Sequence, residues 1–143
     1  MTELNLGLLL FIPYRSMENR VFDALRASGF DDFTPAQARL FQRVDEGGTR
    51  LTALAERAQV TKQTAGFLVD QLERAGYVER VADPRDARAR LITIAPRGRA
   101  AVVRAAEVVA ETEADWAAHL GEETMATLRT ALTRLREITD PYA

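Results

Sequence analysis

The chain has 143 residues, of which 47% are hydrophobic and 28% charged, so it is long enough for one independent core and its composition excludes wholesale disorder. It has no cysteine and a single histidine, which excludes disulfides, cysteine-based oxidant sensing, cysteine-bound metals and a histidine-rich metal site. The net charge of −2 disfavours a nucleic-acid partner, but residues 61–99 carry eight basic and five acidic side chains, a local charge of +3.

Residues 4–28 are predicted to form the first helix, which Gly29 ends. Because Pro13 lies inside this helix, we expect a kink or a break near Phe11–Ile12. The apolar run at residues 6–13 is shorter than the ~18 residues of a membrane span and has neither a basic leader nor a cleavage site. We therefore expect it to be a buried helix of a cytoplasmic protein without a membrane partner.

Two short helices are predicted next. Thr34-Pro35 has a capping residue followed by proline at the first helical position, and the helix it begins is predicted to end at Gly47-Gly48. Residues 49–51 fit a short strand, after which Thr52 is predicted to cap a helix over residues 53–58.

The next predicted helix starts at the N-cap residue Thr61, ends near Ala75 and has Gly76 just beyond its C-terminus. Its apolar residues recur at helical spacing and predict one buried face, formed by Ala65, Leu68, Val69, Leu72 and Ala75. The opposite, outward face carries Gln63, Phe67, Asp70 and Arg74, flanked by Lys62, Thr64 and Gln71.

Two strands at residues 77–78 and 91–94 are predicted to flank an arginine-rich tip at residues 83–88. This order of helix, turn, helix and hairpin predicts a mainly α fold with a small β-wing (α+β), a winged helix-turn-helix whose second helix enters the DNA major groove. A long helix over residues 97–119 and a final one over 122–139 complete the chain. We expect the N- and C-terminal helices to form a dimer interface, or else to complete a monomeric core.

The segment LTALAERAQVTKQTAGFLVDQLERAGYVERVADPRDARARLI resembles the MarR family of bacterial transcriptional regulators. Its most specific features are the run LVDQLERAGYVER and the Asp86-x-Arg88 wing signature followed by Leu91 and Ile92. The resemblance implies one MarR-like domain over residues 1–143, with a DNA-binding core at 34–99 and dimerisation helices at 1–30 and 97–143.

By this resemblance, we expect the chain to be a homodimeric repressor that binds a pseudo-palindromic operator in double-stranded DNA. The resemblance implies release by a small aromatic or phenolic ligand that binds between the dimerisation helices and the winged helix. The resemblance also implies that Arg88 enters the minor groove and that Asp86 orients it, and neighbouring carboxylates do fix the direction of a guanidinium.

The chemistry of the other exposed positions assigns further contacts. Lys62 and Thr64 suit phosphate, Gln63 suits adenine or is a solvated amide, and Thr61 contacts phosphate or only caps the helix. Phe67 either contacts a thymine methyl or turns into the core. The candidate DNA-contacting residues are Thr61, Lys62, Gln63, Thr64, Phe67, Arg74, Arg85, Asp86, Arg88 and Arg90.

Four outward or wing residues have roles that the sequence leaves open. Asp70 is expected to pair with an arginine, Arg74 at i+4, although Arg74 also suits the DNA backbone. Arg85 and Arg90 contact phosphate or are simply solvated.

Tyr14, Met17 and Phe30 are candidates to line a ligand cavity, although side chains at this spacing also suit a core or a dimer interface. No catalytic residues, cofactor or metal are predicted, because the chain lacks a nucleophile–base set and a phosphate-binding glycine loop. Two alternatives remain, a winged-helix regulator without a small-molecule effector and a winged-helix module that binds protein.

Overall fold

The structure is a computed structural model that describes residues 2–141. The chain forms two compact units, one up to Ala24 and from Ala105 onward, the other from Leu25 to Arg104. No helix of the described residues is both long and apolar enough to cross a membrane. The elements in order are α1 (Leu6–Ala27), α2 (Pro35–Phe41), α3 (Leu51–Ala58), α4 (Lys62–Arg74), β1 (Val78–Asp83), β2 (Asp86–Ile94), α5 (Pro96–Leu120) and α6 (Glu122–Thr139).

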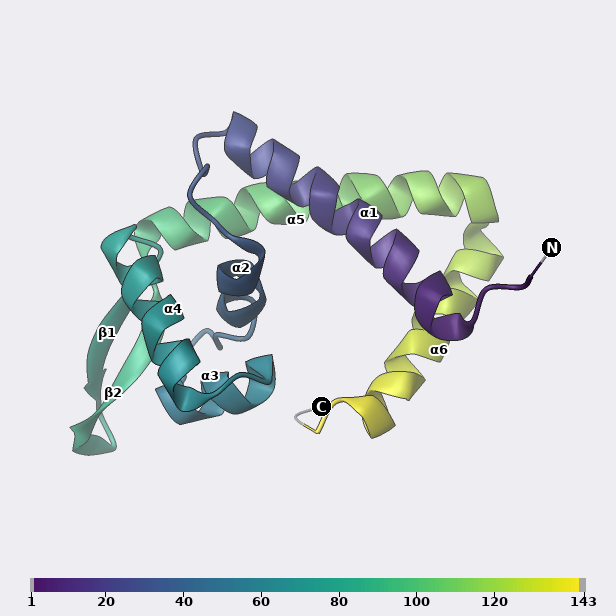
Figure 1. The fold of residues 1–143 in the computed structure, drawn as a ribbon. Coiled ribbons are helices and arrows are strands. Elements are labelled where there is room, and N and C mark those ends of the chain that lie inside the picture. The colour runs from purple at the N-terminus through teal and green to yellow at the C-terminus, as the bar shows by residue number, and fades with distance from the viewer. Residues whose placement is uncertain (1, 142–143) are drawn as a thin grey trace. The chain divides into compact units, whose positions relative to one another are not determined.

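In the unit from Leu25 to Arg104, helices α2, α3 and α4 pack against one another, and the β1–β2 hairpin lies beside α4 (Figure 1). The predicted buried face of α4 is confirmed except at its end, where Ala75 is only half-buried. The fully buried side chains of this core are Leu40, Leu54, Ala65, Val69, Leu72 and Tyr77.

The predicted caps at Thr34 and Thr61 are confirmed. Thr34 accepts a hydrogen bond from the backbone N–H of Gln37, whose side chain accepts one from the Thr34 N–H in return, and Pro35 begins α2. The hydroxyl oxygen of Thr61 accepts the backbone N–H of Thr64 at 3.0 Å. These caps form because the residues involved are three positions apart and need no tertiary partner.

The expected bounds of α2 and α3 are wrong. Helix α2 ends at Phe41, because the chain tightens there and the N–H of Val44 bonds the Phe41 carbonyl instead of continuing the α-helical pattern. The predicted strand at residues 49–51 is reduced to a single bridge between Thr49 and Ile92. Helix α3 then begins at once, with Arg50 as its N-cap, so Thr52 lies inside the helix and does not cap it.

The wing is longer than predicted, because β1 and β2 continue through the charged segment to a two-residue turn at Pro84 and Arg85. Near the tip the register of the two strands shifts. Ala82 pairs with Arg90, but the next residue of β1, Asp83, pairs with Asp86, so residues 87–89 of β2 lie between the two pairs. A bulge of this kind redirects the side chains it contains, and this one contains Arg88.

The other unit comprises the first part of α1, the second part of α5, and α6. An ion pair of 2.9 Å joins Arg20 of α1 to Asp115 of α5, and one of 2.6 Å joins Arg129 of α6 to Glu113 of α5. Helix α1 runs through Pro13 without the predicted break, because a proline removes one backbone donor while the neighbouring hydrogen bonds persist.

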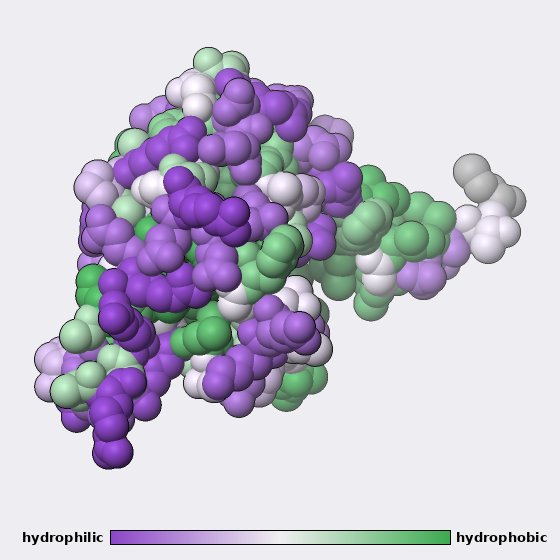
Figure 2. All heavy atoms as spheres, turned by 60° about the vertical axis from the view of Figure 1, so that its left-hand side comes forward, coloured by the Kyte–Doolittle hydropathy of each residue, from purple (hydrophilic) through white to green (hydrophobic). Residues whose placement is uncertain are grey.

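The N-terminal part of α1 is exposed in the single chain, so the expectation of a buried helix is wrong for the isolated protomer. Leu6 is 76% exposed and Phe11 54%, although both are strongly apolar. Hydrophobic side chains gather at this end of α1 in the space-filling view (Figure 2). An amphipathic pattern indicates which face can be buried, and a partner surface decides whether it is.

Candidate nucleic-acid interface

The first turn of α4 presents polar and cationic groups to solvent. Thr61, Lys62, Gln63 and Thr64 are all exposed, and the helix N-terminus adds free backbone N–H groups and the positive end of the helix dipole. The Thr61 hydroxyl is engaged in the cap, since it also donates to Thr64 Oγ1 at 3.0 Å. Lys62, the backbone and the Thr64 hydroxyl, which can still donate its proton, are therefore the groups most suited to a phosphate here.

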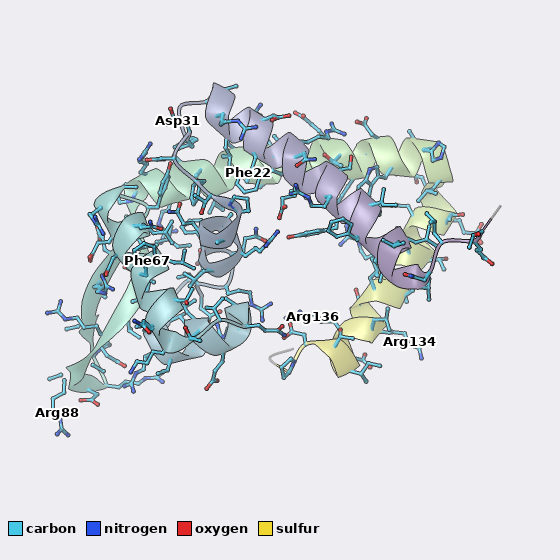
Figure 3. The ribbon with its side chains drawn as sticks, in the orientation of Figure 1. Phe22, Asp31, Phe67, Arg88, Arg134 and Arg136 are labelled. Carbon is cyan, nitrogen blue, oxygen red and sulfur yellow. The ribbon has the colours of Figure 1, made fainter. Side chains whose placement is uncertain are left out.

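Phe67 lies on the outward face of α4 and is 59% exposed (Figure 3). The alternative that its ring turns into the core is thus wrong. The ring lines a surface hollow together with Gln63, Thr64, Gly66 and Asp70. It lies on the outward side because the opposite positions of α4 are already filled by the buried leucine and valine side chains.

Asp70 pairs with Arg80 of β1 at 2.8 Å, and not with Arg74 as expected. Arg80 also pairs with Glu73 at 2.7 Å, so one guanidinium from the wing bridges two carboxylates of α4. Arg74 is exposed. Because Arg80 compensates these two negative charges, the outward face of α4 repels phosphate less than its sequence suggests.

A buried carboxylate anchors the root of the wing turn. Asp83 is 6% exposed, and its Oδ2 accepts two hydrogen bonds from Arg50, from Nε at 3.0 Å and from the terminal nitrogen at 2.8 Å. Its Oδ1 accepts the backbone N–H of Arg85 at 2.9 Å. These donors, the Arg85 N–H first and then Arg50, lower the pKa of Asp83 below its ordinary value of 3.8.

Arg88 extends into solvent from the end of the wing, where its side chain is 96% exposed (Figure 3). Asp86 Oδ1 accepts the backbone N–H of Arg88 at 3.0 Å, while its distance to the Arg88 Nε is 3.8 Å. Asp86 thus orders the backbone and only loosely contacts the guanidinium. Arg85 and Arg90 are also exposed, and the wing tip is strongly hydrophilic (Figure 2).

A polar and aromatic cluster lies behind the C-terminal end of α4. The Tyr77 hydroxyl donates to Asp32 Oδ1, and Arg97 donates to Asp32 Oδ2 at 3.0 Å and to the Ala75 carbonyl at 2.6 Å. Burial favours a higher pKa for Asp32, but the hydrogen bonds from Tyr77 and Arg97 outweigh it and lower that pKa. Burial and the neighbouring Asp32 raise the pKa of Tyr77. The cluster fixes the end of α4 against the start of α5.

The three candidate ligand residues lie in different surroundings. Phe30 belongs to the cluster, with its ring centroid 6.4 Å from that of Tyr77. Tyr14 and Met17 lie on the part of α1 that belongs to the other unit, where the Tyr14 hydroxyl donates to Glu18 Oε2 at 2.8 Å.

Sequence reasoning missed the partners that organise this surface, namely Arg50, Arg80, Asp83, Asp32 and Arg97. The only local signal was Asp83-Pro84, which predicted a turn and no anchor. The remaining partners come from elements distant in the chain.

The geometry of a capped helix beside an arginine-tipped hairpin agrees with comparisons to known proteins. The family model described as MarR family matches residues 31–89, which span α2 to the wing tip. Over these residues the chain is similar to the MarR family, as its sequence motifs predict. Its fold is that of transcriptional regulators, and the predicted winged helix-turn-helix is confirmed.

Solved structures extend the likeness beyond the region that the MarR family model matches. A MarR family protein of Mycobacterium tuberculosis in complex with salicylic acid is 28% identical, with 93% of this chain and 97% of that one covered at a TM-score of 0.66. A transcriptional regulator from Thermotoga maritima is 27% identical, with 92% of each chain covered and a TM-score of 0.65.

A mutant of S. aureus MepR bound to an oligodeoxyribonucleotide is 22% identical. The match covers 94% of this chain and 98% of that one at a TM-score of 0.61, which shows a shared fold. No curated protein matches the sequence significantly.

Proposed function

We propose that this MarR-like protein is a homodimeric, sequence-specific DNA-binding repressor that a small aromatic or phenolic ligand releases. The observation that carries DNA binding is the exposure, on one unit, of both the N-terminus of α4 and the arginine-tipped wing. A helix N-terminus with polar side chains suits the major groove, and an extended arginine suits a narrow minor groove.

Eight of the candidate residues have a proposed role that their positions support. Lys62 and Thr64 contact phosphate at the start of α4, and Gln63 pairs with adenine N6 and N7 in the major groove. Arg88 enters the minor groove while Asp86 orders the backbone that carries it. Phosphate contacts by the exposed arginines complete the interface, and these are Arg74, Arg85 and Arg90.

The exposed apolar surface of the unit that contains α6 supports a homodimer. Helix α6 buries none of its described residues, and Ile138 is 84% exposed. The N-terminal part of α1 adds Leu6 and Phe11, as described above. Large exposed apolar side chains on the helices of one unit indicate a protein interface, and a two-fold dimer matches a pseudo-palindromic operator.

A ligand site that includes Tyr14, Met17 and Phe30 is proposed from their aromatic and flexible side chains. The complex of the M. tuberculosis relative with salicylic acid makes aromatic acids the first compounds to test. A ligand that binds only the folded protein raises its melting temperature, so a thermal shift with salicylate separates this proposal from a regulator without an effector.

The test of DNA binding is capture of fragmented host genomic DNA by the purified protein, followed by titration of the best fragment at several salt concentrations. Enrichment of one inverted repeat, with affinity that falls steeply as salt rises, is the expected result. Sedimentation of the free protein should give the mass of a dimer. If no fragment is enriched at low salt, even after the protein is refolded to remove a bound inducer, a protein-binding winged helix replaces this proposal.

A further inference from the structure

Phe67 is unusual because it is a large apolar ring in the centre of an otherwise polar face. Among the described residues between Leu25 and Arg104, Phe67 is the only aromatic residue whose side chain is exposed. Its neighbours in the hollow are polar or lack a side chain, namely Gln63, Thr64, Gly66 and Asp70. An exposed phenylalanine gains free energy from the hydrophobic effect when an apolar group covers it.

The major groove offers one apolar group, the C5 methyl of thymine. We infer that Phe67 contacts a thymine methyl in the operator and makes the protein select thymine at that position. This inference rests on the proposed DNA-binding function and adds a base preference to it. Phosphates and polar base edges offer no apolar contact to the ring. They suit the polar side chains around it.

The position of that thymine follows from helix geometry. Gln63 and Phe67 are one turn apart on the same face, which separates them by about 6 Å along the helix axis. Successive base pairs are about 3.4 Å apart. The thymine is therefore expected within two base pairs of the base that Gln63 contacts.

The charges around the ring are compatible with this contact. Asp70, three residues further along α4, pairs with Arg80 at 2.8 Å. Gly66 has no side chain to fill the space beside the ring, and a Cβ there would meet Leu51 Cδ2 at 3.7 Å as its nearest neighbour. The ring therefore stands in an open, charge-compensated hollow that a methyl group can enter.

The test replaces single methyl groups in the DNA. A duplex selected by the parent protein from a randomised library is resynthesised with each thymine in turn changed to deoxyuridine, which removes only the methyl. At one position per half-site the parent should bind about fourfold more weakly, the value of one buried methyl group. The Phe67→Ala variant should bind the thymine and uracil duplexes equally, whereas Phe67→Leu should keep part of the preference.

Val81→Ala is the matched control, because Val81 is also an exposed apolar residue of this unit, at 37%, but lies on β1. It should keep the full thymine preference. If Phe67→Ala retains the parent's discrimination, or if no thymine methyl affects the parent, the inference is overturned while the proposed function stands. If the parent selects no duplex at all, the proposed function fails and this inference fails with it.

Discussion

Gly98 and Gly66 both lie inside helices, yet alanine is expected to have opposite effects at the two positions. Gly98 lies in the first turn of α5, packed against the start of the hairpin. A Cβ built there would be 2.2 Å from the Tyr77 carbonyl oxygen, 3.0 Å from Ile94 Cγ2 and 3.1 Å from Phe41 Cε2. The first of these contacts is with backbone, so α5 or the strand has to move.

The cost of Gly98→Ala follows from what would move. Overpacking a core typically costs about 1–3 kcal/mol. The Tyr77 carbonyl also accepts the N–H of Ala95 at 3.0 Å, and loss of that hydrogen bond costs a further ~1 kcal/mol. We therefore expect the free energy of unfolding to fall by roughly 2–4 kcal/mol, a large part of the ~5–15 kcal/mol that a domain has.

Gly66→Ala is the matched control. The nearest atom to its Cβ would be Leu51 Cδ2 at 3.7 Å, an ordinary van der Waals contact. Alanine inside a helix is more stable than glycine by ~0.5–1 kcal/mol, because glycine loses more backbone entropy on folding. This variant should therefore be slightly more stable than the parent.

Urea denaturation followed by circular dichroism measures both effects. The midpoint should fall for Gly98→Ala and rise for Gly66→Ala, with little change in the slope m. A Gly98→Ala protein as stable as the parent would show that the contact with the Tyr77 carbonyl does not exist, and would refute the packing of α5 against the hairpin.

Three further predictions concern the proposed interface. Arg88→Ala should weaken duplex binding and lower the salt slope by about one, with the sedimentation coefficient unchanged; unaltered binding would remove Arg88 from the minor groove. Gln63→Ala should cost ~1–3 kcal/mol of discrimination at one adenine, measured by titrating duplexes changed at single positions, and an unchanged preference at every position would contradict that role. The pKa of Asp83 is lowered in the folded protein, so its stabilisation is complete above the ordinary value of 3.8 and is lost as the pH falls through the lowered pKa. Asp83→Asn should therefore be less stable than the parent at pH 7 in urea denaturation, and it should lose less stability when the pH is lowered. If the free energies of unfolding of the two proteins change in parallel with pH, Asp83 does not anchor the wing.

Features that depend on neighbours in sequence were predictable from the sequence. The caps at Thr34 and Thr61, the buried stripe of α4 and the bounds of α6 all agree with the structure. They depend on hydrogen bonds and side-chain spacing over three or four residues, which local sequence specifies. The DNA-contacting role of Gln63 was assigned from its outward position and that of Arg88 from the resemblance to the MarR family, and both stay predictions.

Features that depend on partners distant in the chain could not be predicted. Asp70 pairs with Arg80 and not with the local Arg74 because a strand brings that guanidinium to α4. Asp83 is paired with Arg50, 33 residues earlier in the chain. In the sequence, Gly98 does not differ from any other glycine in a helix. Only the Tyr77 carbonyl beside it makes a larger side chain destabilising there.

The sequence by itself therefore determined the order and faces of the elements and their resemblance to the MarR family. Tertiary structure decided which charges are compensated, where the wing turns and which apolar side chains are left exposed, Phe67 among them. The physical reason is that secondary structure depends on interactions within a turn or two, whereas burial and ion pairing depend on surfaces that meet only when the chain has folded.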